Sequence, residues 1–279
     1  MTGAGGRLGC LLRHCWAGEA GAGVVWQSRT GSGAGSLAGN SLAWGFGPDT
    51  PAAWPEDGVI LHLAGVTRGT PTELAVNVSL ARSLARIARQ LGASHVLFAS
   101  SVAVYRPGPD DLDEDTAPDP VSDYGRAKWD SELALASDLA GSGTGLTCLR
   151  IGNVAGADAL LGGQAASGGS KVTLDPVPGQ PMGPARSYIG PRALARVLAG
   201  LIPLAPNLPA ALNIAQPGAV VMGDLLNAAR LPWGFGPDRP GTVPRVVVHT
   251  ERLQGLMPVP DATAAGLVAD LRSLAGLWP

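Results

Sequence analysis

The stretch Val59-Ile60-Leu61-His62-Leu63-Ala64 decides the fold, because it is a continuous apolar run. Such a run is typical of a strand that is buried on both faces of a sheet. Residues Thr72 to Leu91 follow it with apolar residues at helical spacing, which predicts a helix. A second buried strand is predicted at Val96-Leu97-Phe98-Ala99. Strands that alternate with helices favour a parallel sheet covered by helices on both faces.

The same alternation extends in both directions along the chain. The further expected elements are a helix at 10–16, a strand at 24–27, irregular structure at 30–57 with a short strand near 42–44, a helix from Ser122 or Asp123 to about Ala140, a strand at 146–150, a helix at 190–202 and a strand at 212–215. We expect residues 1–155, with 187–216 returning to them, to form one domain. Residues 156–186 and 217–279 are expected to form a small C-terminal lobe.

Composition excludes several classes of protein. The chain has 279 residues, of which 46% are hydrophobic and only 15% charged, so it is not disordered as a whole. The net charge of -2 gives no electrostatic footprint for nucleic acid. No run of apolar residues is long enough to span a membrane, and no signal peptide is expected at the N-terminus. Three cysteines give no disulfide framework, so we expect a reducing, cytoplasmic compartment.

Gly3, Gly6 and Gly9 stand three residues apart just before a predicted helix. Glycines there let the backbone approach a pyrophosphate at a helix N-terminus. The alternative is a flexible glycine-rich terminus, since the chain has 40 glycines. A central strand should precede this loop, but only Met1 and Thr2 do. Either the true start lies upstream, which is our hypothesis, or the sheet lacks an internal strand.

Tyr124 and Lys128 are four residues apart on a predicted helix, so both side chains can point at one spot. A nearby cation stabilises phenolate and lowers the pKa of a tyrosine, which makes it a usable proton donor and acceptor. The alternative is a coincidence on a solvated helix. The chain has only three tyrosines and two lysines, so a chance pair at this spacing is rare.

Ser100 and Ser101 directly follow the buried strand at 96–99. The carboxyl ends of parallel strands line the ligand crevice of an open sheet, and a hydroxyl there can hold a substrate oxygen. Capping of the strand end is the alternative, and it suits Ser100 well.

These segments together carry a resemblance. The matching segments are Gly3-x-x-Gly6-x-x-Gly9, His62-Leu63-Ala64-Gly65, Phe98 to Tyr105, Tyr124-x-x-x-Lys128 and Leu149 to Val154, all in the right order. The chain resembles an extended short-chain dehydrogenase/reductase of the NAD-dependent epimerase/dehydratase family. The likeness covers residues 1 to about 155 well and continues more faintly beyond them.

The resemblance implies a Rossmann-type doubly wound parallel sheet with a small C-terminal substrate lobe. It implies Tyr124 as catalytic acid/base, Lys128 as its partner on the nicotinamide ribose, and Ser101 as the holder of the reacting oxygen. The residues implied to bind the cofactor are Gly3, Gly6, Arg7, Leu8, Gly9, Arg29, Leu63, Ala64, Gly65, Tyr124, Lys128 and Ile151. Those implied to bind substrate are Ser101, Asn153 and Arg186. Asn77 is implied to be structural or part of a proton relay.

The implied activity is hydride transfer by an NAD(P)-dependent oxidoreductase or epimerase on a sugar, a nucleotide-sugar or a small carbonyl or hydroxyl compound. A non-catalytic NADP-binding sensor of the same fold is the alternative. Where the family often has an acidic residue after its second strand, this chain has Ser28 and Arg29, which favours NADP over NAD. The alternative is that Arg29 stacks on adenine or faces water.

Two further departures bear on the substrate. Val102-Ala103 replace the Asp-Glu pair of the sugar-nucleotide dehydratases, so water elimination is disfavoured. The short segment between Asn153 and Arg186 suggests a smaller substrate than a nucleotide-sugar.

Other partners receive little support. Cys10, His14 and Cys15 are too few for a metal site, so no metal is expected. The acidic run Asp110 to Asp115 is expected to be a solvated loop before the Tyr124 helix. Besides a small-molecule substrate, we expect no nucleic acid and no membrane, and the sequence leaves a homodimer open.

Overall fold

The structure is a computed structural model that describes residues 1–17, 23–29, 41–46, 58–165, 171–239 and 241–274. Most of the segment expected to be irregular, 30–57, therefore lies outside the described residues. The chain forms two compact units. The first contains Met1–Arg106, Pro118–Arg150 and Ala199–Leu212, and the second contains Pro107–Ala117, Ile151–Leu198 and Asn213–Pro279.

Strands and helices alternate up to β5, and the helix predicted at 72–91 is divided into α2 and α3. The elements are, up to residue 151, α1 (Arg7–Cys15), β1 (Trp26–Ser28), β2 (Ser41–Ala43), β3 (Val59–His62), α2 (Pro71–Leu74), α3 (Val76–Gln90), β4 (His95–Ser101), a 3-10 turn (Val102–Val104), α4 (Asp123–Leu139) and β5 (Gly145–Ile151). Beyond it come β6 (Asn153–Val154), a π-helical turn (Leu160–Ala165), β7 (Val172–Leu174), β8 (Ala185–Arg186), β9 (Tyr188–Ile189), α5 (Pro191–Leu201), a 3-10 helix (Ile202–Asn207), β10 (Ala211–Ile214), β11 (Val220–Val221), α6 (Met222–Ala229), β12 (Trp233–Phe235), β13 (Arg245–Val246), α7 (Glu251–Gln254) and α8 (Ala264–Arg272).

The main sheet has the strand order β10-β5-β4-β3, and β3 pairs with β4 in parallel. β1 and β2 form a separate parallel pair. The expected Rossmann-type α/β fold is confirmed. No described helix is both long and apolar enough to cross a membrane.

The first residues of the chain lie between β1 and β3. The amide of Thr2 donates to the carbonyl of Leu61 at 2.9 Å, and the amide of Gln27 donates to the carbonyl of Met1 at 2.8 Å. Thr2 also forms a parallel bridge with His62. Backbone of Met1 and Thr2 thus pairs with both β1 and β3 at this one level, without forming a strand of its own.

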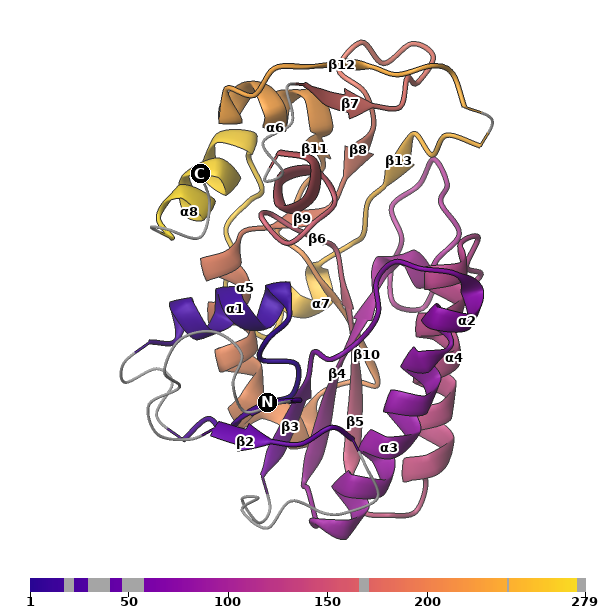
Figure 1. Cartoon of the computed structure of the whole chain (residues 1–279), viewed down its shortest axis with the longest axis vertical. Helices are drawn as coiled ribbons and strands as arrows, with labels where there is room; N and C mark the ends of the chain where they lie inside the picture. The colour runs from indigo at the N-terminus through magenta and orange to yellow at the C-terminus, as the bar shows by residue number, and fades with distance from the viewer. Residues whose placement is uncertain (18–22, 30–40, 47–57, 166–170, 240, 275–279) are drawn as a thin grey trace. The chain divides into compact units, whose positions relative to one another are not determined.

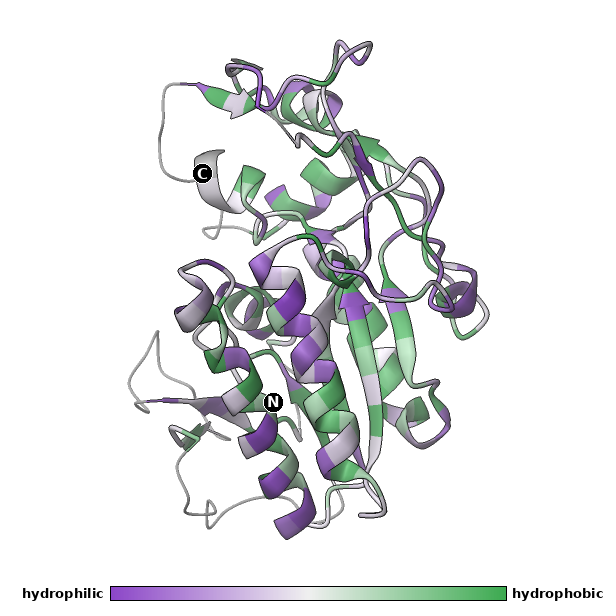
Figure 2. Ribbon diagram, turned by 90° about the vertical axis from the view of Figure 1, so that its right-hand side faces the viewer, coloured by the Kyte–Doolittle hydropathy of each residue, from purple (hydrophilic) through white to green (hydrophobic). Residues whose placement is uncertain are grey.

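The core of the first unit joins α3 and α4 to the strands beneath them. α3 turns its apolar face, including Leu84 and Ala88, onto β3 and β4, while α4 contributes Leu135 and Leu139. Figure 1 shows α3 and α4 on one side of this sheet and α1 on the other. In Figure 2 the strands are mostly hydrophobic in colour, and the helices in front of them carry hydrophilic residues toward the viewer. Burial of these apolar faces is what places α4 against the end of β4.

The second unit has its own core and small sheets. Its strand pairings are β11-β8-β13, β12-β7 and β6-β9. Leu160, Leu174, Leu225 and Leu267 are among the residues that form its buried cluster.

The acidic run at 110–115 is only partly a solvated loop. The side chain of Glu114 is 3% exposed and ion-pairs with Arg252 at 3.7 Å. Its carboxylate also accepts from the amide of Asn213 at 2.8 Å. A buried carboxylate needs such partners because desolvation of an unpaired charge is costly, so the prediction of a solvated loop is wrong at Glu114.

A close backbone contact fixes the start of α4. Ser122 caps the helix by accepting from the amide of Gly125 at 3.0 Å. A Cβ atom at Gly125 would lie 2.1 Å from the carbonyl oxygen of Ala103. Glycine at 125 therefore lets the first turn of α4 touch the 3-10 turn that follows β4.

We expect Gly125→Ala to lower the free energy of unfolding by about 1–3 kcal/mol, because the added methyl forces the backbone apart. The measurement is urea denaturation followed by circular dichroism. Gly108→Ala is the matched control, since a Cβ there meets nothing within 4 Å, and its expected effect is within about 0.5 kcal/mol. Equal stability of the two variants would show that the contact with Ala103 is not a constraint.

Candidate functional site

The glycine-rich loop packs backbone against backbone. Gly3 has φ +74°, and a Cβ there would lie 2.6 Å from the amide nitrogen of Ala64. A Cβ at Gly9 would lie 2.3 Å from the carbonyl oxygen of Gly3. The amide of Gly3 donates to the side chain of Gln27 at 3.1 Å. Gly3 and Gly9 are therefore required by geometry, and flexibility is not the reason for them.

The first turn of α1 has features that favour a bound anion. Gly6 is its N-cap residue, without a side-chain cap, and the first turn contains no acidic residue. The first amide groups of a helix and its dipole favour negative charge at that end. Because glycines also bring this turn close to the loop after β3, the residues present fit a diphosphate group.

Asn77 holds the loop that follows β3. Its side-chain amide donates to the carbonyl of Val66 at 2.9 Å, and its carbonyl oxygen accepts from the amide of Val66 at 2.8 Å. A Cβ at Gly65 would lie 2.9 Å from Asn77 Oδ1 and 3.5 Å from Lys128 Nζ. Of the two roles expected for Asn77, these contacts give it the structural one. They also bring Gly65 next to Lys128.

Ser101, Tyr124 and Lys128 come together where β4 ends and α4 begins. The side chain of Ser101 interacts with the Tyr124 phenol and lowers its pKa, against the larger effect of burial. Lys128 Nζ lies 6.0 Å from the centroid of the Tyr124 ring and donates to the carbonyl of Ala99 at 2.7 Å. It also lies 4.9 Å from the centroid of the Phe98 ring. Contacts thus run from Gly3 through Ala64, Gly65 and Lys128 to Tyr124 and Ser101.

The electrostatics of Tyr124 differ from the prediction. Burial raises the pKa of the phenol above its ordinary value, and the interaction with Ser101 only partly opposes this. The expected lowering by Lys128 is absent, because burial is the dominant effect on the phenol. Tyr124 is therefore a neutral phenol, a proton donor, near neutral pH.

Lys128 itself is strongly perturbed. Burial lowers its pKa to about 8, and the carboxylate of Glu132 opposes this shift. The side chain is 6% exposed. Desolvation disfavours the ammonium form, so the group titrates far closer to neutrality than an exposed lysine.

A buried network of hydrogen bonds and an ion pair lies beneath the site and was not predicted from the sequence. Arg150 donates to Glu132 at 3.0 Å, and both side chains are 5% exposed. Ser100 donates to the same carboxylate, so its hydroxyl does more than cap the end of the strand. The sequence does contain a signal for this network. Glu132 follows Lys128 by four residues, so it lies on the helix face that also carries Tyr124.

The other predicted site residues belong to both units of the chain. Arg29 and Arg7 are exposed and Leu8 is partly buried, all in the first unit. Ile151, Asn153 and Arg186 belong to the second unit. The guanidinium of Arg186 donates to the carbonyls of Ala185 and Val243, each at 2.8 Å. The described residues contain no cluster of three or more groups suited to a metal.

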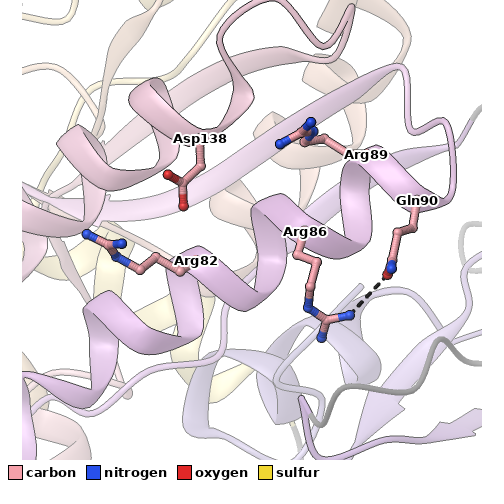
Figure 3. Close-up of a pocket in the computed structure, with 5 residues that line it drawn as sticks. All are labelled: Arg82, Arg86, Arg89, Gln90 and Asp138. Atoms are coloured by element: carbon pink, nitrogen blue, oxygen red, sulfur yellow. Dashed lines mark hydrogen bonds between the residues drawn. The ribbon is translucent and has the colours of Figure 1, made fainter.

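A surface concavity lined by residues of α3 and α4 is separate from the site of Ser101, Tyr124 and Lys128. Figure 3 shows Arg82, Arg86 and Arg89 along α3, with Asp138 of α4 facing them. Arg86 donates to Gln90 at 3.0 Å. Asp138 follows Tyr124 by almost four helical turns, which separates the two by about 20 Å along α4. This basic surface is thus remote from the reacting groups.

The sequence of the chain matches a known protein family over the region that contains the candidate site. Residues 56–170 match the model of the NAD dependent epimerase/dehydratase family. The resemblance to this family is confirmed. The matched residues include the loop after β3, Ser101, Tyr124 and Lys128. No curated protein sequence matches the chain at a significant level.

Solved structures of the family's fold resemble the whole chain. MoeE5 in complex with UDP-glucose and NAD is 22% identical, with a TM-score of 0.76, and 98% of each chain is covered. UDP-glucose-4-epimerase from Stenotrophomonas maltophila, with bound NAD and formylated UDP-arabinopyranose, is 18% identical, with a TM-score of 0.78 over 98% of this chain and 96% of that one. UDP-glucose 4-epimerase from Thermus thermophilus in complex with NAD is 20% identical, with a TM-score of 0.77 over 99% and 98%. These likenesses show the fold.

The lowered pKa of Lys128 predicts how stability depends on pH. Below pH 8 the lysine is charged in both states, and the cost of burying the charge is fully present. Between about pH 8 and 10.5 the folded state loses the proton first, so the unfolded state binds more protons and stability rises. Relative to Lys128→Met, the wild type should gain about 2 kcal/mol between pH 7 and 9.5.

Urea denaturation of both proteins at several pH values in this range measures the gain. A wild type whose unfolding free energy runs parallel to that of Lys128→Met would contradict the lowered pKa.

Proposed function

We propose that the protein is an NAD(P)-dependent epimerase or dehydrogenase of the short-chain dehydrogenase/reductase type. The observation that carries the proposal is the joining of Ser101, Tyr124 and Lys128 to the glycine-rich loop by the contacts through Gly65 and Ala64. The match of residues 56–170 to the NAD dependent epimerase/dehydratase family supports it.

The cofactor would be held by the first unit. Gly3, Gly6 and Gly9 with the start of α1 would bind the diphosphate, and Ala64 and Gly65 would lie along the dinucleotide. Lys128 would bind the nicotinamide ribose. When bound, the nicotinamide supplies the acceptor and donor of hydride. Leu63, Arg7, Leu8 and Ile151 are proposed as further cofactor contacts.

The chain's own groups would handle the proton. Tyr124, a neutral phenol in the structure, would donate its proton to a substrate carbonyl oxygen, or as phenolate accept one from a hydroxyl. Ser101, whose side chain interacts with Tyr124, would hold that same oxygen. The ammonium of Lys128 would stabilise the phenolate when Tyr124 has given up its proton.

The proposed substrate is a sugar or nucleotide-sugar. The titles of the similar structures name UDP-glucose and formylated UDP-arabinopyranose, which supports this class. Asn153 and Arg186, in the second unit, are proposed as substrate contacts, which would make that unit the substrate-binding lobe. Val102 and Ala103 offer no second acid/base after Ser101, so elimination of water is not proposed.

A panel of UDP-sugars and simple sugars, each tested with NAD and with NADP, examines the proposal. A change of configuration without net reduction of the dinucleotide identifies an epimerase, whereas accumulation of reduced dinucleotide identifies a dehydrogenase. Dinucleotide binding without turnover of any substrate would instead favour the sensor.

Tyr124→Phe should lower turnover by at least about 10²-fold, because it removes the general acid/base. Dinucleotide affinity should stay nearly unchanged, since the ring is retained. Steady-state kinetics and isothermal titration calorimetry measure the two quantities. Neither of the other tyrosines serves as a control, because the hydroxyl of Tyr188 bonds to Asp158 and that of Tyr105 to Arg150. Asp130→Asn, which removes an exposed carboxylate from the same helix, is the control and should leave turnover unchanged. An unchanged rate in Tyr124→Phe would refute the role of the phenol.

Arg29→Ala tests the proposed preference for NADP. The titles of the similar structures name NAD instead. Loss of the guanidinium should weaken NADP by about tenfold and NAD much less, because only NADP carries a 2′-phosphate. Fluorescence titration with each dinucleotide gives both dissociation constants. Equal weakening of both would remove the basis for an NADP preference.

A further inference from the structure

Two hydrogen bonds join α4 to the end of β4 beneath the site. Lys128 Nζ donates to the carbonyl of Ala99 at 2.7 Å. The hydroxyl of Ser100, the next residue, donates to a carboxylate oxygen of Glu132. Ser101 follows directly. The strand end that presents Ser101 is thus bonded to the helix that presents Tyr124 and Lys128.

Glu132 is the anchor of the second bond and is itself firmly held. It follows Lys128 by one helical turn and Tyr124 by two, so all three side chains lie on one face of α4. Arg150 of β5 bonds to its carboxylate through Nη2 at 3.0 Å and through Nε at 3.4 Å. Arg150 in turn donates to the hydroxyl of Tyr105 at 2.9 Å, and its guanidinium carbon lies 4.9 Å from the Tyr105 ring centroid. The carboxylate therefore has one fixed position.

We propose that Glu132 is the positioning residue of the Ser101, Tyr124 and Lys128 site, and that it acts by locking the end of β4 to α4 and by holding a negative charge next to the Lys128 ammonium. The catalytic part of this statement rests on the proposed function. The link between Glu132 and Lys128 does not, because it concerns the protein alone.

The other titratable groups around Lys128 do not supply this charge. On β3, burial lowers the pKa of His62 to about 3, so the imidazole is neutral near neutral pH. On β5, burial raises the pKa of Cys148 well above its usual value, so the thiol is neutral as well. Arg150, also on β5, is a cation, and Tyr124, on α4 itself, is a neutral phenol. The carboxylate of Glu132 is what opposes the effect of burial on Lys128.

A purely structural ion pair would behave differently. Buried carboxylate–guanidinium pairs hold many cores together, and removal of one partner destabilises the fold whatever lies nearby. Such a role predicts lower stability with an unchanged catalytic rate of the folded protein. A positioning role predicts that both the titration of Lys128 and the catalytic rate change.

The experiment measures the titration of Lys128 directly. The chain has two lysines, so a protein labelled with ¹³C-lysine gives two Cε signals, and Lys171→Arg assigns them. The titration is followed in the dinucleotide-free protein from pH 6 to 11. Glu132→Gln keeps the shape of the side chain and removes the charge. Asp130→Asn, which removes an exposed carboxylate from the same helix, is the matched control.

Glu132→Gln should lower the midpoint of Lys128 by about one pH unit, and Glu132→Asp, which keeps the charge, should restore most of it. Asp130→Asn should leave it unchanged. Ser100→Ala breaks one bond of the lock without stranding a buried charge. It should lower the midpoint by about half a unit and kcat by about tenfold, with KM changed less than about twofold.

An unchanged midpoint in Glu132→Gln, or a shift equalled by Asp130→Asn, overturns the proposal. If Glu132→Gln does not fold, Ser100→Ala decides through the same titration, and an unchanged midpoint there overturns it too. Absence of turnover with every sugar in the wild type would count against the proposed function only, because the lysine titration needs neither cofactor nor substrate.

Discussion

The site depends on one buried hydrogen bond, from the ammonium of Lys128 to the carbonyl of Ala99. A charged group with 6% of its surface exposed is costly unless it is bonded and balanced. The carbonyl of Ala99 accepts the hydrogen bond, and the carboxylate of Glu132 supplies the opposite charge. Apolar packing brings α4 against β4, and this bond holds Lys128 at the strand end where Tyr124 and Ser101 meet.

Close backbone contacts support the same arrangement from three directions. Gly3 lies against Ala64, Gly9 against Gly3, and Gly125 against Ala103. At each place a Cβ atom would stand closer than 3 Å to a backbone atom. Such contacts tolerate little displacement because atoms in a packed interior have no free volume to move into. Close backbone packing thus supports the candidate site alongside the bond of Lys128.

Much of this could be predicted from the sequence, for identifiable reasons. The apolar runs at Val59–His62 and Val96–Ala99 have one favourable environment, a sheet covered on both faces, and this gave the α/β fold. The spacing of Tyr124 and Lys128 gave the helical face they share. Periodicity could not show that Lys128 bonds to Ala99, because that bond joins residues far apart in the chain. Nor could it show that burial raises the pKa of Tyr124. The pairing of Thr2 with both neighbours and the burial of Glu114 likewise depend on distant partners.

The burial of Lys128 has a practical consequence for anyone who handles this protein. The sequence contains two lysines, and the other one, Lys171, is exposed in the second unit. A reagent that acylates lysine side chains will therefore react with Lys171, because burial makes Lys128 inaccessible to it. A dye or surface linker can thus be attached to one chosen side chain outside the unit that carries Tyr124, with no lysine engineered in or removed.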